Sequence, residues 1–184
     1  DVLHRILNAA HHAPSVGFMQ PWDFIVIQDS EIKEKIKSGF EAANQQSAKM
    51  FSGERQEKYK SLKLEGIMEA PIGVCVTCDR ERTGPVVLGR TVQKEMDLYS
   101  SVCAVQTLWL AARAENIGVG WVSIVEKELI NEVLEIPRSI VPIAYLCMGY
   151  VESFHEEPEL EKAGWLPRVS VDEVIHYNKW SNHK

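Results

Sequence analysis

The residues best suited to chemistry lie in one loop, Ala13–Trp22, whose sequence is APSVGFMQPW. Ser15, Val16 and Gly17 offer backbone N–H groups and one small hydroxyl, and glycine can adopt a positive φ that other residues avoid. The side-chain amide of Gln20 can both donate and accept hydrogen bonds. Such a surface suits a flat heteroaromatic ring with carbonyls and nitrogens along one edge. The residue types alone are equally consistent with an ordinary connection between a helix and a strand.

A helix and a strand position this loop. Apolar residues spaced three or four apart predict a helix that is under way at Val2 and includes Ala10. Pro14 ends that helix, because the residue before a proline avoids the helical region. After the loop, residues 24–27 form a short β-branched and aromatic run, which predicts a buried strand.

The rest of the chain alternates between helical and strand-like patterns. We expect three more helices and three more strands, namely helices over 31–43, 96–115 and 126–134 and strands over 72–77, 118–124 and 140–150. These elements predict an α+β fold, with a mixed central sheet of about four strands flanked by helices. The helix over 96–115 is apolar on more than one face, so it is either buried or packed against a partner chain.

Size and composition fit one globular domain. The 184 residues are 45% hydrophobic and 25% charged, so we expect a single core and one domain over residues 1–184. The net charge of −6 gives no support to nucleic-acid binding, which favours a basic patch. No apolar run reaches the roughly 18 residues of a membrane span, and no signal-peptide pattern opens the sequence. We therefore expect a cytoplasmic protein that binds neither nucleic acid nor membrane.

The cysteines give no support to a metal site. Cys75 and Cys78 have the spacing of a redox or zinc pair, but they fall in a strand-like run. Because side chains alternate along a strand, the two thiols point to opposite faces of a sheet, which makes joint metal ligation awkward. We expect buried, reduced thiols in a cytosolic protein, and no metal.

The loop resembles the one that holds flavin mononucleotide (FMN) in the nitroreductase-like flavoproteins, most closely in the branch of 5,6-dimethylbenzimidazole synthases. The distinctive part is SVGFMQPW at 15–22, because the wider family shares only a looser Pro-Ser…Gln-Pro-Trp pattern. The resemblance extends, in order, over nearly the whole chain. It includes FSGER at 51–55, LKLEGI at 62–67, CVTCDR at 75–80, VLGR at 87–90 and GVGWVSI at 118–124.

The resemblance implies a set of flavin-contacting residues along the chain. They are Pro14, Ser15, Val16, Gly17, Gln20, Met50, Leu88, Gly89, Arg90, Trp121, Val122, Ser123 and Arg168. Ser123 is also the implied catalytic residue, because its hydroxyl falls where it can reach the reactive edge of the ring; a serine bonded to backbone is the alternative. Arg90 contacts the cofactor or a lid, or else belongs to a solvated ion pair. Arg168 is the candidate for the FMN phosphate, with Arg138 and Lys162 as alternatives.

Residues 44–66 are the candidate lid over the flavin ring. The segment is polar and charged, with few apolar residues, and its composition alone fits a solvated amphipathic helix. The resemblance assigns it to a lid, which gives Met50 and Phe51 a ring to cover. A lid that excludes bulk water would prolong the life of a reduced flavin that has reacted with oxygen.

The activity implied by the resemblance consumes the flavin itself. Reduced FMN reacts with O₂ and is fragmented to 5,6-dimethylbenzimidazole, the lower ligand of cobalamin, and erythrose 4-phosphate. NAD(P)H contributes indirectly, through a separate flavin reductase. Members of the family are intertwined homodimers with flavin at the subunit interface, which gives the apolar helix over 96–115 a partner.

Two other functions stay open at this point. One is an NAD(P)H-dependent nitroreductase or flavin reductase, against which the lid-like segment argues. The other is an inactive FMN-binding protein. The chain starts at Asp1 with a helical pattern already under way, so we expect it to begin inside a longer natural sequence. The family carries an Arg-Arg-Asp-Val-Arg segment upstream of this point, and its absence from these residues favours the binding protein. In the family, the arginines of that segment contact the flavin phosphate and its aspartate takes part in the chemistry.

Overall fold

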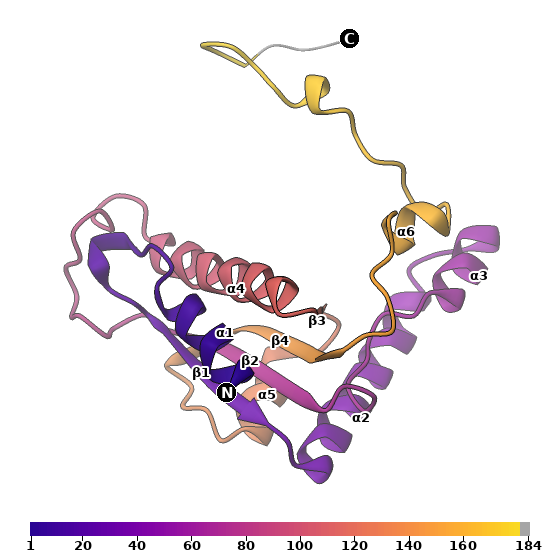
Figure 1. Ribbon diagram of the computed structural model, residues 1–184, viewed down its shortest axis with the longest axis horizontal. Coiled ribbons are helices and arrows are strands. Elements are labelled where there is room, and N and C mark those ends of the chain that lie inside the picture. Colours follow the sequence, from indigo (N-terminus) through magenta and orange to yellow (C-terminus); the bar gives the residue numbers. More distant parts are fainter. Residues whose placement is uncertain (181–184) are drawn as a thin grey trace.

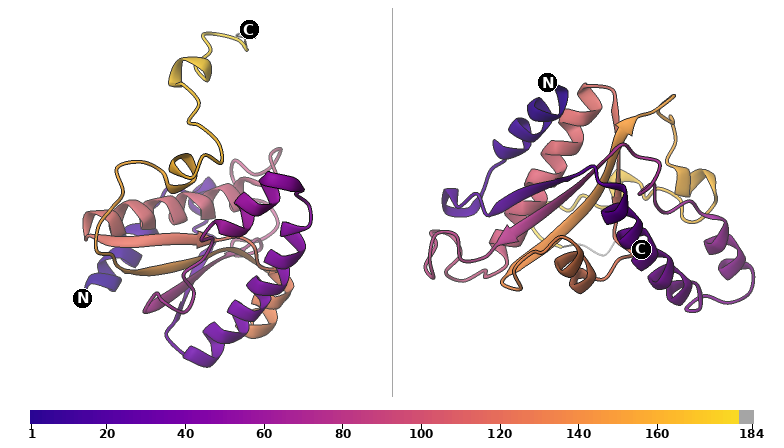
Figure 2. Two further views of the ribbon diagram at one scale, coloured as in Figure 1. Left: turned by 90° about the vertical axis from the view of Figure 1, so that its right-hand side faces the viewer. Right: turned by 90° about the horizontal axis from the view of Figure 1, so that it is seen from below.

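The computed structural model describes residues 1–180 and shows a four-stranded sheet with helices on both faces (Figures 1 and 2). The strand order is β1 (Trp22–Ile27), β2 (Ile72–Asp79), β4 (Ile140–Tyr150) and β3 (Ile117–Val122). This confirms the α+β fold and the number of strands.

The sheet is antiparallel rather than mixed, so the sequence prediction is wrong on this point. All three pairs of neighbouring strands run in opposite directions. The helix α4 (Met96–Ala114) carries the chain back along the sheet, so β2 and β3 run in the same direction. The final strand β4 lies between these two and runs against both, which removes the parallel pairing.

Each face of the sheet is covered by two helices. On one face, α1 (Val2–His11) and α4 pack over side chains from the central strands. On the other face lie α2 (Ser30–Ala48) and α5 (Lys127–Val133), which contribute Ile36, Phe40 and Ile130 to a second core cluster. The right-hand view in Figure 2 shows the strands between the two helix pairs.

The cysteines of β2 follow the alternation of the strand. Val74 and Val76 belong to the core beneath α1 and α4, whereas Cys75 belongs to the core beneath α2 and α5. Burial raises the pKa of the Cys75 thiol to about 12, so this thiol stays protonated at neutral pH. All four cysteines are unpaired thiols. Within residues 1–180 no group of three or more His, Cys, Asp and Glu is placed to hold a metal ion.

The second helix begins where the sequence predicts and ends later. The Asp29 carboxylate caps α2 by accepting from the backbone N–H groups of Glu31 and Ile32, at 2.8 and 3.1 Å. The helix runs to Ala48, five residues beyond the expected end, because residues 44–48 contain neither glycine nor proline. A short helix, α3 (Gly53–Ser61), follows within the candidate lid and buries only Tyr59.

The helix α4 presents apolar residues on two sides. Ala104, Leu108 and Ala112 are fully buried against the sheet and α1. Val102 and Leu110 are exposed on the opposite side. One face of α4 thus carries apolar surface that the chain itself does not cover. Among the described helices none has the length and apolarity to cross a membrane.

Proline at position 142 distorts a central strand. Proline is favoured on edge strands or at the start of a strand, whereas Pro142 is the third residue of the central strand β4, opposite Thr77. The register between β2 and β4 shifts at Val76/Thr77, a distortion that accommodates a residue without a backbone N–H. The hydroxyl of Thr77 is buried there and has no hydrogen-bond partner.

The chain leaves the body of the fold after β4. It passes through α6 (Glu159–Lys162) and the short 3-10 turn η2 (Val171–Glu173). Figure 1 shows this tail running away from the sheet, and its apolar residues Leu166, Val169 and Tyr177 are exposed.

Replacing Thr77 with valine tests the cost of the buried hydroxyl. Thr77→Val is expected to raise the free energy of unfolding by about 1 kcal/mol, because a methyl group of similar shape replaces a polar atom without a partner. Urea denaturation measures the difference. The control is Thr107→Val, because the exposed Thr107 hydroxyl already donates to the Cys103 carbonyl, at 2.8 Å, and its removal brings no gain. A less stable Thr77 variant would contradict the prediction.

Candidate functional site

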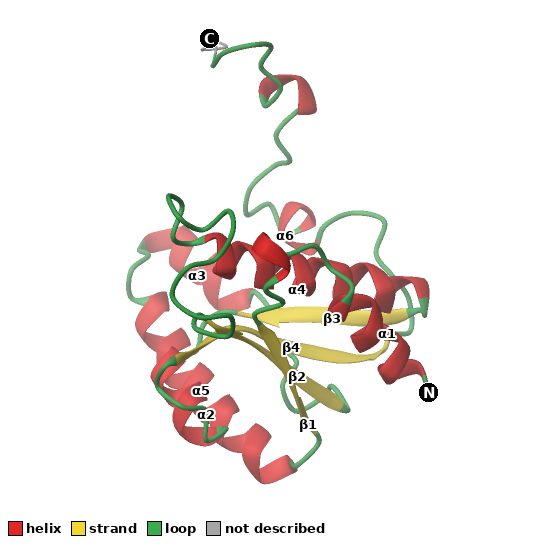
Figure 3. Ribbon diagram, turned by 90° about the vertical axis from the view of Figure 1, so that its left-hand side faces the viewer, coloured by secondary structure: helices red, strands yellow, loops and turns green. Residues whose placement is uncertain are grey.

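One end of the sheet gathers most of the predicted site residues. The first residue of β1, Trp22, pairs with Cys78 near the end of β2, and Cys78 also pairs with Val141 near the start of β4. The last residue of β3, Val122, pairs with Tyr145 of β4. The starts of β1 and β4 therefore lie at the same end of the sheet as the ends of β2 and β3. Four connections therefore emerge together, at residues 13–21, 80–95, 123–126 and 134–139. We call this set the loop end; Figure 3 looks toward it, with the loops in green.

Two of these loops touch at a pair of glycines. A Cβ atom on Gly17 would lie 2.7 Å from the carbonyl oxygen of Leu88, and one on Gly89 would lie 3.1 Å from Cγ2 of Val16. Both glycines have positive φ, +52° and +83°. Only glycine at these positions lets the backbones approach so closely. Residues 14–20 and 87–90, which carry eight of the predicted flavin contacts, thus form one surface, which we call the paired loops.

The paired loops present backbone donors that the protein does not use. Within residues 1–180, the N–H groups of Ser15, Leu88 and Gly89 have no hydrogen-bond partner. The N–H of Val16 differs from the prediction, because it donates to Ser100 Oγ at 3.0 Å and is not free for a ligand. The Ser15 hydroxyl accepts from the N–H of Gln20, at 3.0 Å.

The side-chain amide nitrogen of Gln20 stabilises the turn. Its Nε2 donates to the carbonyl of Phe18, at 3.0 Å, and both residues have positive φ. Within the described residues its Oε1 accepts no hydrogen bond, so an acceptor remains beside the free donors of the paired loops.

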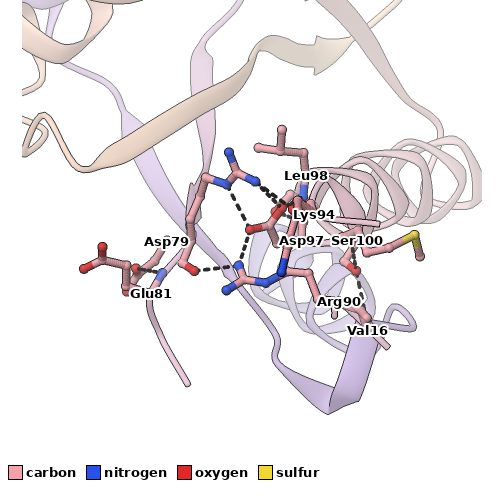
Figure 4. A network of polar contacts seen from close by, with 11 residues as sticks. Val16, Asp79, Glu81, Arg90, Lys94, Asp97, Leu98 and Ser100 are labelled. Carbon is pink, nitrogen blue, oxygen red and sulfur yellow. Dashed lines mark hydrogen bonds and ion pairs between the residues drawn. The ribbon is translucent and has the colours of Figure 1, made fainter. Parts of the chain in front are cut away.

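A buried carboxylate fastens the second of the paired loops (Figure 4). Asp97, in the first turn of α4, is fully buried and forms ion pairs with Arg90 and with Arg80, the latter at 3.0 Å. It also accepts from the N–H of Leu98, at 2.8 Å. Arg90 therefore belongs to an ion pair, as one alternative expected, but the pair is buried rather than solvated.

The surroundings of Asp97 favour its charged form. Burial raises the pKa of this carboxyl, but hydrogen bonds from Arg80, the Leu98 N–H and Arg90 outweigh burial, so the net pKa lies below its ordinary value. The folded protein therefore holds Asp97 ionised at neutral pH, between two guanidinium groups.

Ser123 lines a small cavity at the other edge of the loop end. The cavity is about 180 Å³ and is lined by Trp121, Val122, Ser123 and neighbouring residues of α5 and β4. The Ser123 hydroxyl is exposed and has no partner among the described residues, so the alternative of a serine bonded to backbone is wrong. Sites that enclose a small molecule usually measure about 300–1,000 Å³, so this cavity by itself does not enclose a flavin ring.

Met50 and Arg168 lie far from the paired loops in the same chain. Met50 is 82% exposed at the turn between α2 and α3. Arg168 follows α6, where its backbone N–H donates to Glu161 Oε1 at 3.0 Å. Figure 1 places α3 and α6 on the opposite side of the molecule from the loop that precedes β1, and the tail beyond α6 runs away from the sheet. One copy of the chain therefore does not bring the predicted site residues together. Of the two alternatives to Arg168, Arg138 lies at the loop end and Lys162 on α6.

The candidate lid is anchored to the start of the tail by aromatic contacts. The Phe51 ring stacks on Tyr59, with centroids 5.0 Å apart, and meets Trp165 edge-on at 5.4 Å. Arg55 lies over the Trp165 ring at 4.5 Å, and Lys58 donates to the carbonyl of Gly164 at 2.7 Å. Phe51 is thus occupied within its own chain, and Met50 is the apolar residue of this turn that is open to a ligand.

Comparison with known proteins identifies the family. The sequence model of the Nitroreductase family matches residues 1–150. The chain belongs to the nitroreductase family. This confirms the resemblance seen in the sequence and the prediction of an oxidoreductase enzyme.

Two curated relatives share the more specific resemblance. A protein of Rhodospirillum rubrum named 5,6-dimethylbenzimidazole synthase is 40% identical over 168 residues, which is 91% of this chain and 80% of that protein. A protein of the same name from Rhodobacter capsulatus is 35% identical, over 93% of this chain and 83% of its own. The predicted resemblance to this branch of the family is confirmed.

A solved structure shares the fold. Oxidized iodotyrosine deiodinase, bound to FMN and 3-iodo-L-tyrosine, superposes with a TM-score of 0.74 and 21% identity, over 97% of this chain and 88% of that chain. This similarity supports the nitroreductase fold assigned to the chain.

Sequence reasoning missed the residues that hold the paired loops in place. Arg80, Asp97 and Ser100 were not among the predicted site residues. The sequence held a signal for Asp97, because this residue stands at the start of a strongly apolar helical pattern. In the structure its side chain is fully buried. A charged residue on a buried helix requires a partner, and arginines precede it at positions 80 and 90.

Gly17→Ala tests whether the contact between the paired loops supports FMN binding. The added methyl would meet the Leu88 carbonyl at 2.7 Å, so the loops are expected to separate and FMN affinity to fall by about tenfold, corresponding to 1.4 kcal/mol. Fluorescence titration measures it. Gly84→Ala is the control, since Gly84 also has positive φ but nothing lies within 4 Å of its added Cβ. Equal affinity for FMN in both variants would contradict the role of the contact.

Asp97→Asn tests the buried ion pairs through the pH dependence of stability. A carboxyl whose pKa is lowered on folding stabilises the fold above its unfolded pKa, here near 3.8, and that contribution is lost as pH falls through the folded pKa. At pH 7 the variant is expected to lose about 3 kcal/mol of stability, because the largely buried Arg90 guanidinium and the partly exposed Arg80 guanidinium lose their buried counter-charge.

The measurement is chemical denaturation of wild type and Asp97→Asn from pH 7 down to pH 3, where the difference between them is expected to shrink. The control is Asp172→Asn in the exposed tail, which is expected to match wild type at every pH. A difference that stays constant with pH would contradict an ionised Asp97.

Proposed function

We propose that this protein binds FMN between two copies of the chain and catalyses the oxygen-dependent fragmentation of reduced FMN. The products are 5,6-dimethylbenzimidazole, used as the lower ligand of cobalamin, and erythrose 4-phosphate. The observation that carries the proposal is the surface of the paired loops, with its unused donors, in a chain 40% identical to a named 5,6-dimethylbenzimidazole synthase.

The paired loops fit the edge of a flavin ring. Free N–H groups of Ser15, Leu88 and Gly89 are suited to its carbonyl oxygens, and the absence of side chains on Gly17 and Gly89 leaves the backbone accessible. The Gln20 amide oxygen can accept from a ring N–H. A planar ligand with alternating donors and acceptors along one edge is the chemistry that this surface recognises.

A second copy of the chain is needed to complete the site. α3, which follows Met50, and α6, which precedes Arg168, lie on the opposite side of each chain from the paired loops, and the cavity beside Ser123 is too small to enclose the ring. The uncovered apolar face of α4 and the extended tail both offer surface for a partner copy. In a homodimer, the loops of one copy would face Met50 and Arg168 of the other.

The residues of the chain have distinct tasks in this reaction. Reduced FMN supplies the electrons and the ring carbons, and O₂ is the co-substrate. The paired loops orient the ring, and the Ser123 hydroxyl is free to donate a hydrogen bond at its reacting edge. Met50 and α3 exclude water from the ring, while Arg168, with its two-point guanidinium geometry, binds the phosphate. A separate flavin reductase that uses NAD(P)H supplies the reduced FMN.

The decisive experiment is incubation of the protein with chemically reduced FMN in air, followed by chromatography. We expect 5,6-dimethylbenzimidazole to form as FMN disappears, and neither change to occur without oxygen. Turnover of NADPH on a nitroaromatic compound with no loss of flavin would instead indicate a nitroreductase. Flavin that remains bound and intact would indicate a binding protein.

Ser123→Ala tests the catalytic hydroxyl separately from flavin binding. Loss of a donor to developing charge is expected to slow formation of 5,6-dimethylbenzimidazole by about 100-fold while FMN affinity stays nearly constant. Ser139→Ala is the control, because Ser139 is also an exposed serine at the loop end but does not line the cavity. Equal rates in the two variants would remove Ser123 from the mechanism.

A further inference from the structure

The first turn of α4 is bonded to both of the paired loops. Ser100 Oγ accepts from the N–H of Val16, at 3.0 Å, and donates to the Met96 carbonyl at 2.6 Å. Asp97, three residues earlier, pairs with Arg90, the residue directly after Gly89. Figure 4 shows Ser100 reaching Val16 and Asp97 reaching Arg90 from the same helix end. Neither contact belongs to a helix or a strand ladder; both join the first turn of α4 to a connecting loop.

These contacts act where the loops have little other support. Met19 and Val87 are buried and anchor each loop at one point. The residues between these anchors and the glycine contact are open, since Phe18 and Leu88 are more than four-fifths exposed. The orientation of the intervening peptide groups therefore depends on hydrogen bonds, and the bond to Ser100 is the one that turns the Val16 N–H inward.

Ser100 is itself too buried to contact a ligand. Its exposed fraction is 4%, and its hydroxyl is already both a donor and an acceptor. Turning the Val16 N–H toward α4 fixes the plane of the peptide group between Ser15 and Val16. The free N–H groups of Ser15, on one loop, and of Leu88 and Gly89, on the other, are thereby held at a fixed distance from each other. An effect of Ser100 on a ligand would have to pass through the loop.

We propose that Ser100, together with Asp97, is a positioning residue for the flavin. The first turn of α4 fixes the spacing of the two loops that bind the ring edge, so FMN affinity depends on a hydroxyl that never touches FMN. This inference rests on the proposed function and adds to it the element that aligns the site.

The test compares Ser100→Ala with Ser101→Ala. Ser101 is the matched control, because its hydroxyl donates to the Asp97 carbonyl within the helix, at 3.2 Å, and contacts Cys78 but neither of the paired loops. Three quantities are measured on the full chain: hydrogen exchange of the apoprotein over residues 14–20, FMN affinity by fluorescence titration, and the visible absorption band of bound FMN.

Ser100→Ala is expected to accelerate exchange at Val16, to raise the Kd for FMN by about tenfold and to shift the flavin absorption band. Ser101→Ala is expected to leave all three close to wild type. The position of the absorption band reports hydrogen bonding at the flavin ring. A general loss of protein stability would not change this position. Equal Kd values and equal spectra for the two variants would overturn the inference. Failure of the wild type to bind FMN would overturn the proposed function instead.

Arg90→Lys approaches the same question from the second loop. In the wild type, the Arg90 guanidinium bonds at once to the Asp97 carboxylate and to the Arg80 carbonyl, the latter at 2.6 Å. Lysine keeps the charge opposite Asp97 but lacks the planar guanidinium, so it loses the bond to the Arg80 carbonyl. We expect weaker FMN binding and a shifted band at unchanged secondary structure by circular dichroism. Wild-type affinity and spectrum in this variant would show that the first turn of α4 does not align the loops.

Discussion

The arrangement of the loop end depends on one constraint, the burial of the Asp97 charge. A carboxylate removed from water costs several kcal/mol unless opposite charges and hydrogen bonds replace the solvent. Two arginines and a backbone N–H provide that replacement, and both arginines come from the connection between β2 and α4. The connection must therefore fold back over the start of α4, which carries Leu88 and Gly89 to the loop that precedes β1. The contact between Gly17 and Leu88 follows from this path.

Local patterns predicted most of the elements, and the reasons are visible in the structure. The apolar spacing of α1 and α4 matches residues that pack on the sheet, and Pro14 follows the end of α1. The alternation along β2 separated Cys75 from Cys78. Local patterns did not predict the direction and the pairing of the strands. The position of β4 between β2 and β3 is determined by contacts between residues that are distant in sequence. Asp97 escaped notice for the same reason, since its partners are identified by folding.

The candidate site was predicted residue by residue, and the resemblance also implied that it lies at a subunit interface. The resemblance named Ser15, Gly17, Leu88 and Gly89, and the fold brings these four together. It also named Met50 and Arg168, which the same chain holds on its other side. The first group is adjacent because the sheet register brings its loops to one end. The second is remote because α2 and the chain beyond β4 extend past the sheet, which is why the proposed function places the site between two copies. Closed twofold symmetry would then create two equivalent sites.

The aromatic contacts around Phe51 have a consequence for how the molecule can deform. The ring of Trp165, the guanidinium of Arg55 and the bond from Lys58 to the Gly164 carbonyl join α3 to the chain beyond β4. A shift of α3 would have to break these contacts or carry residues 160–165 with it. The contacts therefore couple the positions of two segments that are more than a hundred residues apart in the sequence.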